Sequence, residues 1–221
     1  MEKNNNIICV TGTGTEVGKT VVTGLLAQYL GKNHDVITQK WVQSGNTQNP
    51  DIAIHDQYTK SSYPDHIQAL RQVYTFKAPM SPHLAAQLEG KTINTQHLIH
   101  ATTTLSQHCD TVLLETSGGI MVPLNKNETT GDIVAKMGIP TIVVAPNQLG
   151  TINHTLLTIH YLKSKGIPIL GFIMNTFFAT QADIEKDNPR IISDLSGVPC
   201  IGHVGADRIT NLDDKTFDAT P

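Results

Sequence analysis

The sequence predicts an α/β fold, in which a mostly parallel sheet carries helices on both faces. Segments expected to form strands, such as residues 7–10 and 141–145, are nearly continuous apolar runs, as in parallel strands that are covered on both sides. These runs alternate with helical patterns along the chain, which is the order of right-handed βαβ units. The 221 residues suffice for one sizeable core, so we expect a single domain over residues 1–221.

A glycine-rich turn follows the first predicted strand, residues 6–11, and leads into the first predicted helix. The turn runs from Gly12 to Thr20, and five residues separate Gly12 from Gly18, one more than in the usual phosphate-binding loop. Strand, glycine-rich turn, Lys-Thr and helix in this order are typical of a P-loop NTPase fold. Because the turn and the helix N-terminus attract anions, we expect Lys19 at the β- and γ-phosphates of a nucleotide and the Thr20 hydroxyl at Mg²⁺.

The first helix is expected over residues 19–30, and the second strand over residues 35–39, ending at Lys40. Residues 41–46 are then expected to leave the sheet as a loop that carries Ser44. Ligands of open α/β sheets bind beyond the carboxyl ends of the strands. Lys40 and Ser44 are therefore expected to act on what the phosphate-binding loop holds.

Acidic residues in two segments are candidates for binding the metal. Asp51 begins a helical pattern over residues 51–56, where it is either a plain helix N-cap or a metal ligand that faces the phosphates. Asp56 competes for the metal role, although the spacing favours Asp51. Glu115 ends an apolar strand over residues 111–115, as the second metal-associated carboxylate of P-loop NTPases does. The alternative for Glu115 is a hydrogen-bonded surface carboxylate.

The rest of the chain continues the alternation of helices and strands. Residues 61–80 are expected to be irregular, and residues 116–119 are expected to form a tight turn. Further helices are expected over residues 81–90, 94–107, 132–137, 149–165 and 181–195, and further strands over residues 141–145, 167–174 and 200–204. The polar tail, residues 205–221, is expected to be partly loose.

Composition and charge argue against several classes of protein. The formal net charge of −3 gives no general attraction to nucleic acid or to anionic membranes, and no apolar run is long enough to span a bilayer. Without an apolar signal-peptide core, and without a CxxC pair among the three cysteines, we expect a cytoplasmic protein with reduced thiols. The ten histidines show no metal-ligand spacing, and His55 is interpreted as an ordinary surface or core residue.

Five motifs in chain order resemble those of the dethiobiotin synthetase family. They are the segment Thr11 to Thr20, Lys40-x-x-x-Ser44-Gly45, Ser81-Pro82-His83 with Glu89-Gly90, Glu115 with Gly118-Gly119, and Gly150-x-Ile-Asn-His, which ends at His154. The long turn between Gly12 and Gly18 is itself this family's form. The resemblance extends from the first strand to about residue 205. It departs at Trp41 and Gly205, where the family often has proline, and at Thr116 and Ser117, where it prefers glycine or alanine.

The resemblance implies an ATP-dependent carboxylation that closes a ring. CO₂ adds to the 7-amino group of 7,8-diaminopelargonate as a carbamate, and the γ-phosphoryl group of ATP then activates the carbamate as a mixed anhydride. Attack by the 8-amino group closes the ureido ring of dethiobiotin and releases phosphate. Because a carbamate attacking a triphosphate brings anions together, catalysis depends mainly on positioning and on neutralising charge.

The resemblance also implies a role for each candidate residue. Lys40, Lys19 and Thr15 are catalytic and converge on the reacting phosphate and the carbamate. Thr20, Asp51 and Glu115 hold Mg²⁺, the cofactor. The nucleotide contacts Glu16, Val17, Gly18, Lys19, Thr20, Val21, Asp51, Glu115, Thr116, Ser117, Gly118, Asn175, Thr176, Val204, Gly205 and Ala206, with Asn175 at the edge of the adenine.

Substrate-binding residues are implied in two parts of the chain. Ser44 positions the diamine or its carbamate. Gly150, Thr151 and Asn153 lie at the start of a predicted helix, and the resemblance implies that this turn binds the distal carboxylate of the substrate across the interface of a homodimer. Simple capping of the helix is the alternative for this turn.

Two other functions are compatible with the phosphate-binding loop. One is a regulatory P-loop ATPase of the ParA/MinD type, which binds DNA or membrane. Those proteins usually carry a second lysine early in the loop, where this chain has Thr13 and Gly14, and the sequence shows no basic patch or basic amphipathic tail. The other is a different amide- or carbamate-forming ligase of the superfamily, although the chain is short for the glutaminase domain that many of these ligases carry.

Overall fold

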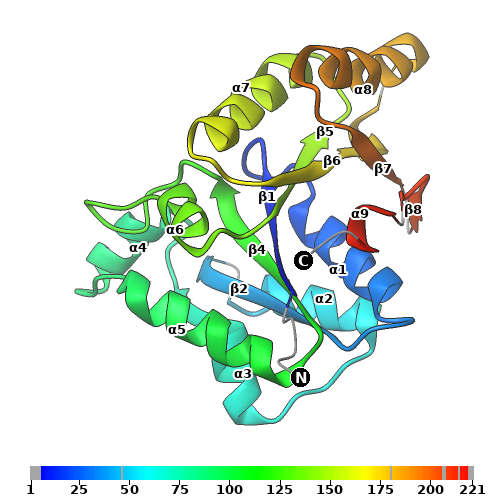
Figure 1. The fold of residues 1–221 in the computed structure, drawn as a ribbon. Coiled ribbons are helices and arrows are strands. Elements are labelled where there is room, and N and C mark those ends of the chain that lie inside the picture. Colours follow the sequence, from blue (N-terminus) through cyan, green and yellow to red (C-terminus); the bar gives the residue numbers. More distant parts are fainter. Residues whose placement is uncertain (1–5, 46, 180, 206–207, 214, 219–221) are drawn as a thin grey trace.

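The computed structural model describes residues 6–45, 47–179, 181–205, 208–213 and 215–218. Within these residues one sheet has the strand order β3-β2-β4-β1-β5-β6-β7-β8 (Figure 1). The strands are β1 (Asn6–Gly12), β2 (Val36–Ser44), β3 (Gln72–Phe76), β4 (Thr111–Gly119), β5 (Thr141–Pro146), β6 (Ile169–Asn175), β7 (Cys200–Gly205) and β8 (Arg208–Thr210). All neighbouring strands are parallel except β7 and β8, which are antiparallel. The predicted mostly parallel α/β fold is thus confirmed.

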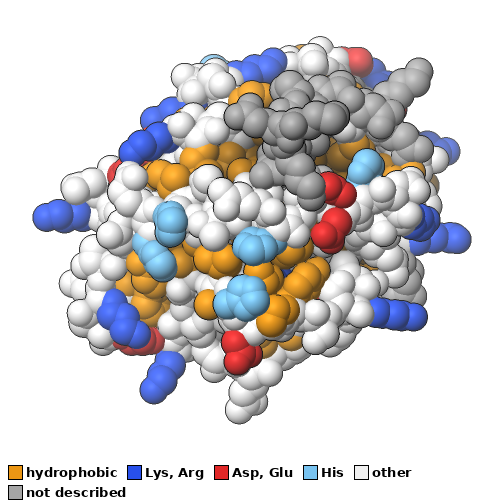
Figure 2. All heavy atoms as spheres, turned by 60° about the horizontal axis from the view of Figure 1, so that its bottom comes forward, with side chains coloured by type: hydrophobic (Ala, Val, Ile, Leu, Met, Phe, Trp, Pro, Cys, Tyr) orange, Lys and Arg blue, Asp and Glu red, His pale blue; other side chains and the backbone are white. Residues whose placement is uncertain are grey.

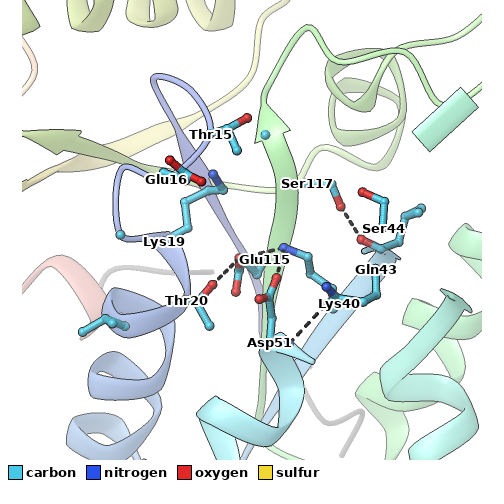
Figure 3. A pocket seen from close by; sticks show the side chains of 14 residues that line it. Thr15, Glu16, Lys19, Thr20, Lys40, Gln43, Ser44, Asp51, Glu115 and Ser117 are labelled. Atoms are coloured by element: carbon cyan, nitrogen blue, oxygen red, sulfur yellow. Dashed lines mark hydrogen bonds and ion pairs between the residues drawn. The ribbon is translucent and has the colours of Figure 1, made fainter. Parts of the chain in front are cut away.

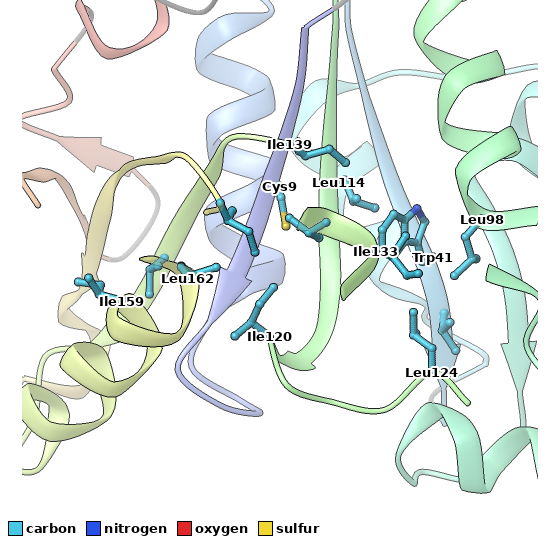
Figure 4. Close-up of a cluster of buried hydrophobic side chains, with 14 of the residues drawn as sticks. Cys9, Trp41, Leu98, Leu114, Ile120, Leu124, Ile133, Ile139, Ile159 and Leu162 are labelled. Atoms are coloured by element: carbon cyan, nitrogen blue, oxygen red, sulfur yellow. The ribbon is translucent and has the colours of Figure 1, made fainter. Parts of the chain in front are cut away.

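Helices connect the strands and cover both faces of the sheet. They are α1 (Lys19–Leu30), α2 (Asp51–Thr59), α3 (Asp65–Arg71), α4 (Pro82–Leu88), α5 (Thr95–Leu105), α6 (Thr130–Met137), α7 (Thr151–Ser164), α8 (Ala182–Ser196) and α9 (Lys215–Asp218), with short 3₁₀ helices η1 (Ser106–His108) and η2 (Thr176–Phe178). One apolar cluster contains Ile8 of β1 and Leu26 of α1. Another contains Cys9 with Ile133 of α6 and Leu162 of α7 (Figure 4). Because Ile8 and Cys9 are neighbours in a strand, they point to opposite faces of the sheet.

β2 extends further than the sequence predicts. The prediction that residues 41–46 leave the sheet after Lys40 is wrong for residues 41–44, because β2 continues to Ser44 and β3 pairs alongside the extension. Gly45 lies beyond the strand, and residue 46 lies outside the described residues. Trp41 is 2% exposed, and its indole Nε1 donates a 2.8 Å hydrogen bond to Thr102 Oγ1 in α5. A large buried side chain with a satisfied N–H group holds this part of the chain in the sheet.

Two other segments are more regular than predicted. The prediction that residues 61–80 are irregular is wrong, because they contain α3 and β3. β3 lies at an edge of the sheet, and only Phe76 is buried in it, so it lacks the apolar run of a central strand. The prediction of a tight turn over residues 116–119 is wrong as well, because β4 continues to Gly119, which pairs with Gly12 of β1.

The end of the chain also contributes structure. β8 pairs with β7, and Ile209, Leu212 and Phe217 pack against the apolar cluster that contains Leu26 of α1. The described part of residues 205–221 is therefore attached to the core, which differs from the loose tail that its polar composition predicts.

Among the described residues, no helix combines the length and the apolar character needed to cross a membrane.

On the face shown in Figure 2, Lys and Arg side chains are spread around the outline, and histidines lie among apolar side chains nearer the centre. The basic side chains of this face are thus dispersed, whereas a nucleic-acid-binding surface gathers them into a patch.

Candidate functional site

A cavity of about 400 Å³ lies at the carboxyl ends of β1, β2 and β4 (Figure 3). Four segments line it: the glycine-rich turn before α1, the end of β2, the first residue of α2 and the end of β4. Lys19, Thr20, Lys40, Asp51 and Glu115 all line this cavity. The structure therefore brings together predicted site residues from distant parts of the chain.

The glycine-rich turn places Lys19 at the cavity. Gly18 has a φ of 93° and caps α1, and a Cβ at this position would lie 2.0 Å from Asn175 Nδ2, so the turn requires glycine here. Lys19 begins α1, and its Nζ donates a 2.8 Å hydrogen bond to the carbonyl of Gly14. The lysine thus lies across the turn and next to the helix N-terminus, the arrangement that binds phosphate groups.

Lys40 lies at the centre of a buried charged network. Its Nζ is 2.7 Å from Glu115 Oε1 and 2.7 Å from Asp51 Oδ2, and it donates a 3.1 Å hydrogen bond to the carbonyl of Thr116. Thr20 Oγ1 donates to the same Glu115 oxygen at 3.1 Å. Glu115 is 1% exposed, so the alternative of a surface carboxylate is wrong. Two carboxylates from different elements point at one cationic group.

Charge and burial together set the protonation of this network. Burial disfavours the charged form of Glu115, but the Lys40 ammonium and a hydrogen bond from His55 outweigh it and hold the pKa of Glu115 far below its usual value. Burial likewise opposes the charge of Lys40, yet Glu115 and Asp51 raise the pKa of Lys40. Lys19 differs, because burial lowers its pKa to about 8. Repulsion by the Lys40 ammonium also lowers this pKa, whereas attraction by the Glu115 carboxylate opposes the change. At neutral pH the pair of Lys40 and Glu115 is fully ionised.

His55 is a site residue that the sequence interpretation missed. It is buried, and its Nε2 lies 2.8 Å from Glu115 Oε2. His55 follows Asp51 by four residues in α2, and this spacing places both side chains on one face of the helix. That spacing is the signal in the sequence that indicates the contact, once Asp51 is taken to face the cavity.

The structure separates the two aspartates of α2. Asp51 faces Lys40, whereas Asp56 Oδ1 lies 2.6 Å from Nη2 of the buried Arg71. The N-cap of α2 is Pro50 and Asp51 is the first helical residue, so the capping alternative for Asp51 is wrong. Of the two candidate metal ligands in this helix, Asp51 is the one that lines the cavity.

Other predicted residues line the same cavity. They are Thr15, Glu16, Gly18, Val21, Ser44, Ser117 and Gly118. Glu16 has a φ of 59°, a left-handed conformation that is uncommon for a residue other than glycine. Ser117 Oγ donates a hydrogen bond to the carbonyl of Val42. Val17 and Thr116 are buried and do not belong to the described cavity lining, so Thr116 reaches the site through its carbonyl oxygen.

The residues predicted at the adenine form a group beside the glycine-rich turn. Asn175 Nδ2 donates a 3.0 Å hydrogen bond to the carbonyl of Val17 in that turn. Thr176 Oγ1 donates a 2.9 Å hydrogen bond to the carbonyl of Val204. Asn175 thus supports the turn from the end of β6, which is a contact that the sequence did not predict.

The remaining predicted residues lie elsewhere. Gly150 has a φ of 90° and caps α7, whose first turn contains Thr151 and Asn153. These three residues are described by the structure but are not among those that line the cavity of Figure 3; Asn153 instead lines a groove between α7 and α8. Gly205 ends β7, and Ala206 lies outside the described residues.

Solved structures of other proteins share this fold. A ParA family ATPase from Chlorobium tepidum TLS superposes with a TM-score of 0.60 at 12% identity, covering 92% of this chain and 86% of that one. The septum site-determining protein MinD from Pyrococcus horikoshii OT3 superposes with a TM-score of 0.56 at 18% identity, covering 90% and 80%. At such identities the likeness shows the P-loop NTPase fold alone.

Sequence relatives identify the family more closely. Residues 6–212 match a family model described as an AAA domain. ATP-dependent dethiobiotin synthetase BioD from Bacillus subtilis subsp. natto is 37% identical over 198 residues, covering 87% of this chain and 84% of the relative. The protein of the same name from Brachyspira hyodysenteriae is 34% identical over 218 residues, covering 96% of each. With the motifs assembled around one cavity and these relatives along nearly the whole chain, the protein belongs to the ATP-dependent dethiobiotin synthetase family.

Proposed function

We propose that this protein catalyses the ATP-dependent conversion of 7,8-diaminopelargonate and CO₂ to dethiobiotin, with release of ADP and phosphate. Besides the family, one observation carries the proposal: Lys40 Nζ lies 2.7 Å from both Asp51 and Glu115, in the cavity that Lys19 also lines. Two lysines and two carboxylates around one cavity suit a reaction in which two anions must meet.

The oxygen donors of the cavity suit Mg²⁺, the cofactor that the family implies. Thr20, Asp51 and Glu115 offer hydroxyl and carboxylate oxygens, which are the ligands that Mg²⁺ prefers, and Lys40 already bridges the two carboxylates. Among the described residues no group of three or more Asp, Glu, His or Cys side chains is suited to a metal. Phosphate oxygens of the nucleotide would complete the coordination, as is usual for Mg²⁺, and the ion would offset the phosphate charge.

The residues around the cavity divide the work of charge neutralisation and orientation. The 7-amino nitrogen bonds to CO₂ and loses a proton, and Ser44 orients the resulting carbamate. A carbamate oxygen then attacks the γ-phosphorus, and the bond to the β–γ bridging oxygen breaks as ADP leaves. Lys19 and Lys40 offset the negative charge of the phosphoryl group during this step, and the Thr15 hydroxyl donates a hydrogen bond to it. Attack of the 8-amino nitrogen on the carbonyl carbon breaks the C–O bond to phosphate, and a second proton leaves.

We place the base of ATP beside Asn175 and Thr176. The Asn175 amide is hydrogen-bonded to the turn at Val17, so a nucleotide whose phosphates lie along that turn has its other end near β6. Thr176 joins this position to the end of β7 through Val204. The adenine pocket is thus proposed to lie between the ends of β6 and β7.

A homodimer with a shared active site explains the position of Gly150, Thr151 and Asn153. They lie at the N-terminus of α7, where backbone N–H groups can bind the distal carboxylate of the diamine, yet they do not line the described cavity of their own chain. The adjacent Leu149 is 87% exposed, as expected of an apolar side chain that another copy covers.

We place the enzyme in the cytoplasm, where ATP is supplied and free thiols such as Cys9 stay reduced.

Product formation is the direct test of the proposed function. The purified protein is incubated with ATP, Mg²⁺, bicarbonate and diaminopelargonate, and dethiobiotin is measured by mass spectrometry, with ¹³C-labelled bicarbonate to mark the new carbonyl carbon. We expect labelled dethiobiotin and ADP in equal amounts. ADP release that does not depend on the diamine, with no dethiobiotin, would overturn the proposal.

A further inference from the structure

The two carboxylate oxygens of Glu115 have different surroundings. Oε1 accepts hydrogen bonds from Lys40 at 2.7 Å and from Thr20 at 3.1 Å. Oε2 lies 2.8 Å from His55 Nε2. Because Glu115 and His55 are both buried, and His55 is not among the residues that line the cavity, the contact between Oε2 and Nε2 is shielded from water. The carboxylate is therefore held from two sides, and His55 provides the contact on the side away from Lys40.

Within the part of the chain that the structure describes, the ring of His55 makes one polar side-chain contact, through Nε2. Among the described residues, its buried Nδ1 has no hydrogen-bond partner. Since an ionised carboxylate only accepts hydrogen bonds, the ring proton lies on Nε2 and is donated to Glu115. An apolar side chain would fill this buried position without leaving a polar atom unpaired. The contact with Glu115 is thus what the imidazole provides and an apolar side chain does not.

The packing of α2 fixes His55 in place. Asp51 and His55 lie one turn apart on the same face of α2, so the helix that brings Asp51 to the cavity also brings His55 to Glu115. α2 approaches α1 closely at Gly24, where a Cβ would lie 2.4 Å from Tyr58 Cδ2. This close approach leaves the histidine little freedom to move away from the carboxylate.

We propose that His55 is a positioning residue whose Nε2–H holds one oxygen of Glu115, so that the other oxygen points at the cation position shared with Asp51. The inference rests on the proposed function, in which Glu115 holds Mg²⁺. Loss of a hydrogen-bond partner of a metal ligand commonly weakens metal binding by about 10- to 100-fold. Without His55 the metal should bind more weakly, whereas nucleotide binding without metal should not change.

The test measures metal affinity directly. Mn²⁺, a paramagnetic substitute for Mg²⁺, is titrated by electron paramagnetic resonance in the presence of a non-hydrolysable ATP analogue, and the affinity for the analogue is measured in EDTA by calorimetry. His55→Leu removes the donor, and His55→Gln keeps an N–H group at a similar reach. Ile52→Val, a buried change in the same helix, controls for altered packing, and thermal unfolding is recorded for every variant.

We expect His55→Leu to raise the dissociation constant for Mn²⁺ by about 10-fold or more. His55→Gln should restore most of the affinity, and Ile52→Val should match the wild type, with analogue affinity in EDTA equal in all. An unchanged Mn²⁺ affinity in His55→Leu, or an equal loss in His55→Gln, would overturn the proposal. If His55→Leu does not fold, His55→Asn, whose amide is too short to reach Glu115, takes its place.

The dethiobiotin assay separates this inference from the proposed function. A wild-type protein that makes dethiobiotin while His55→Leu binds Mn²⁺ normally refutes only the role of His55. A wild-type protein that makes none refutes the proposed function, and the Mn²⁺ titration still reports on the contact with Glu115.

Discussion

Lys40 and Glu115 form an ion pair inside the protein, with 2.7 Å between Nζ and Oε1 and with side chains only 5% and 1% exposed. Their parallel strands, β2 and β4, are neighbours, and the two residues are direct partners in the register. A buried pair of this kind is costly to break, because the charge that remains loses its partner of opposite charge. The same ammonium is the group that we propose to meet the terminal phosphate, so this pair links the stability of the protein to its chemistry.

Replacing Lys40 by alanine should abolish diamine-dependent ADP release while ATP still binds. The substitution removes the proposed catalytic ammonium but leaves the glycine-rich turn with Lys19 intact. It should also lower the free energy of unfolding by roughly 3–5 kcal/mol, because Glu115 loses its buried partner. Calorimetry measures ATP binding and denaturant unfolding measures stability, with the exposed Lys136→Ala as control. Normal turnover in a folded Lys40→Ala variant would contradict the role.

Binding of an ATP analogue to the free protein should weaken as the pH rises through about 8. Burial lowers the pKa of Lys19 to about 8, so the ammonium is charged below this pH and becomes neutral above it, losing its attraction for phosphate. Lys19→Arg keeps its charge throughout and should show no such weakening. Calorimetric titrations from about pH 7 to about pH 9.5 compare the two proteins; a flat wild-type profile would count against a depressed pKa.

The lowered pKa of Lys19 also makes the stability of the folded protein depend on pH. Since the folded protein holds the proton of Lys19 less tightly than the unfolded chain does, the unfolded state binds more protons between about pH 8 and pH 10.5. The free energy of unfolding therefore increases with pH through this window as far as Lys19 contributes to it. Below the window, the burial of the charged Lys19 destabilises the folded protein most.

Exchanging each aspartate of α2 for asparagine should separate metal binding from folding. Asp51→Asn should increase the Mg²⁺ concentration needed for half-maximal activity, because it removes a carboxylate from the cavity. Asp56→Asn should leave the Mg²⁺ dependence unchanged but lower the free energy of unfolding by about 1.5–3 kcal/mol, since buried Arg71 loses a charged partner. A change of Mg²⁺ dependence in Asp56→Asn alone would reverse the assignment.

Thr102→Val should destabilise the protein although Thr102 is not among the residues that line the cavity. The Thr102 hydroxyl accepts the indole N–H of Trp41 and lies 2.8 Å from Gln39 Oε1, so valine leaves buried polar groups without partners at a cost of about 1–3 kcal/mol. The exposed neighbour Thr103→Val is the matched control. Because Trp41 is the single tryptophan, its fluorescence follows unfolding; equal stability of both variants would contradict the importance of this contact.

Asn153→Ala should mainly raise the KM for the diamine and leave kcat nearly unchanged, because the proposed contact binds a part of the substrate that does not react. If the site is shared between two copies, a mixture with inactive Lys40→Ala protein should recover activity at low diamine, since a mixed dimer contains one intact site. An unchanged KM, or a mixture no more active than its parts, would remove Asn153 from the substrate site.

The sequence predicts those parts of the fold that carry a strong local signal. β1 is an apolar run followed by a glycine-rich turn, and α1 begins at Lys19 as expected. β3 is missed because an edge strand with one buried residue looks like a loop. The extension of β2 is missed because the reason for it, the hydrogen bond between Trp41 and Thr102, joins residues that are distant in the sequence.

In the candidate site, too, the sequence predicts the residues that carry a local signal and misses the contacts between distant residues. Lys40, Asp51 and Glu115 are identifiable because each follows a segment predicted to form a strand or begins a helical pattern, which places it on the ligand-binding side of the sheet. The distance between Lys40 and Glu115 follows from the register of β2 and β4, and the contacts of Asp51 and His55 follow from the packing of α2 against α1 and β2. No local pattern encodes either arrangement. His55 therefore had the spacing of a site residue but no local feature to distinguish it from a core histidine.

In the proposed mechanism the terminal phosphate of ATP binds between Lys19 and Lys40. A crystal structure with Mg²⁺ and a non-hydrolysable ATP analogue tests it most directly. We expect Lys40 Nζ within hydrogen-bond distance, about 3 Å, of an oxygen of the terminal phosphate. Lys40 turned away from that phosphate and beyond the reach of its side chain in every copy would contradict the mechanism.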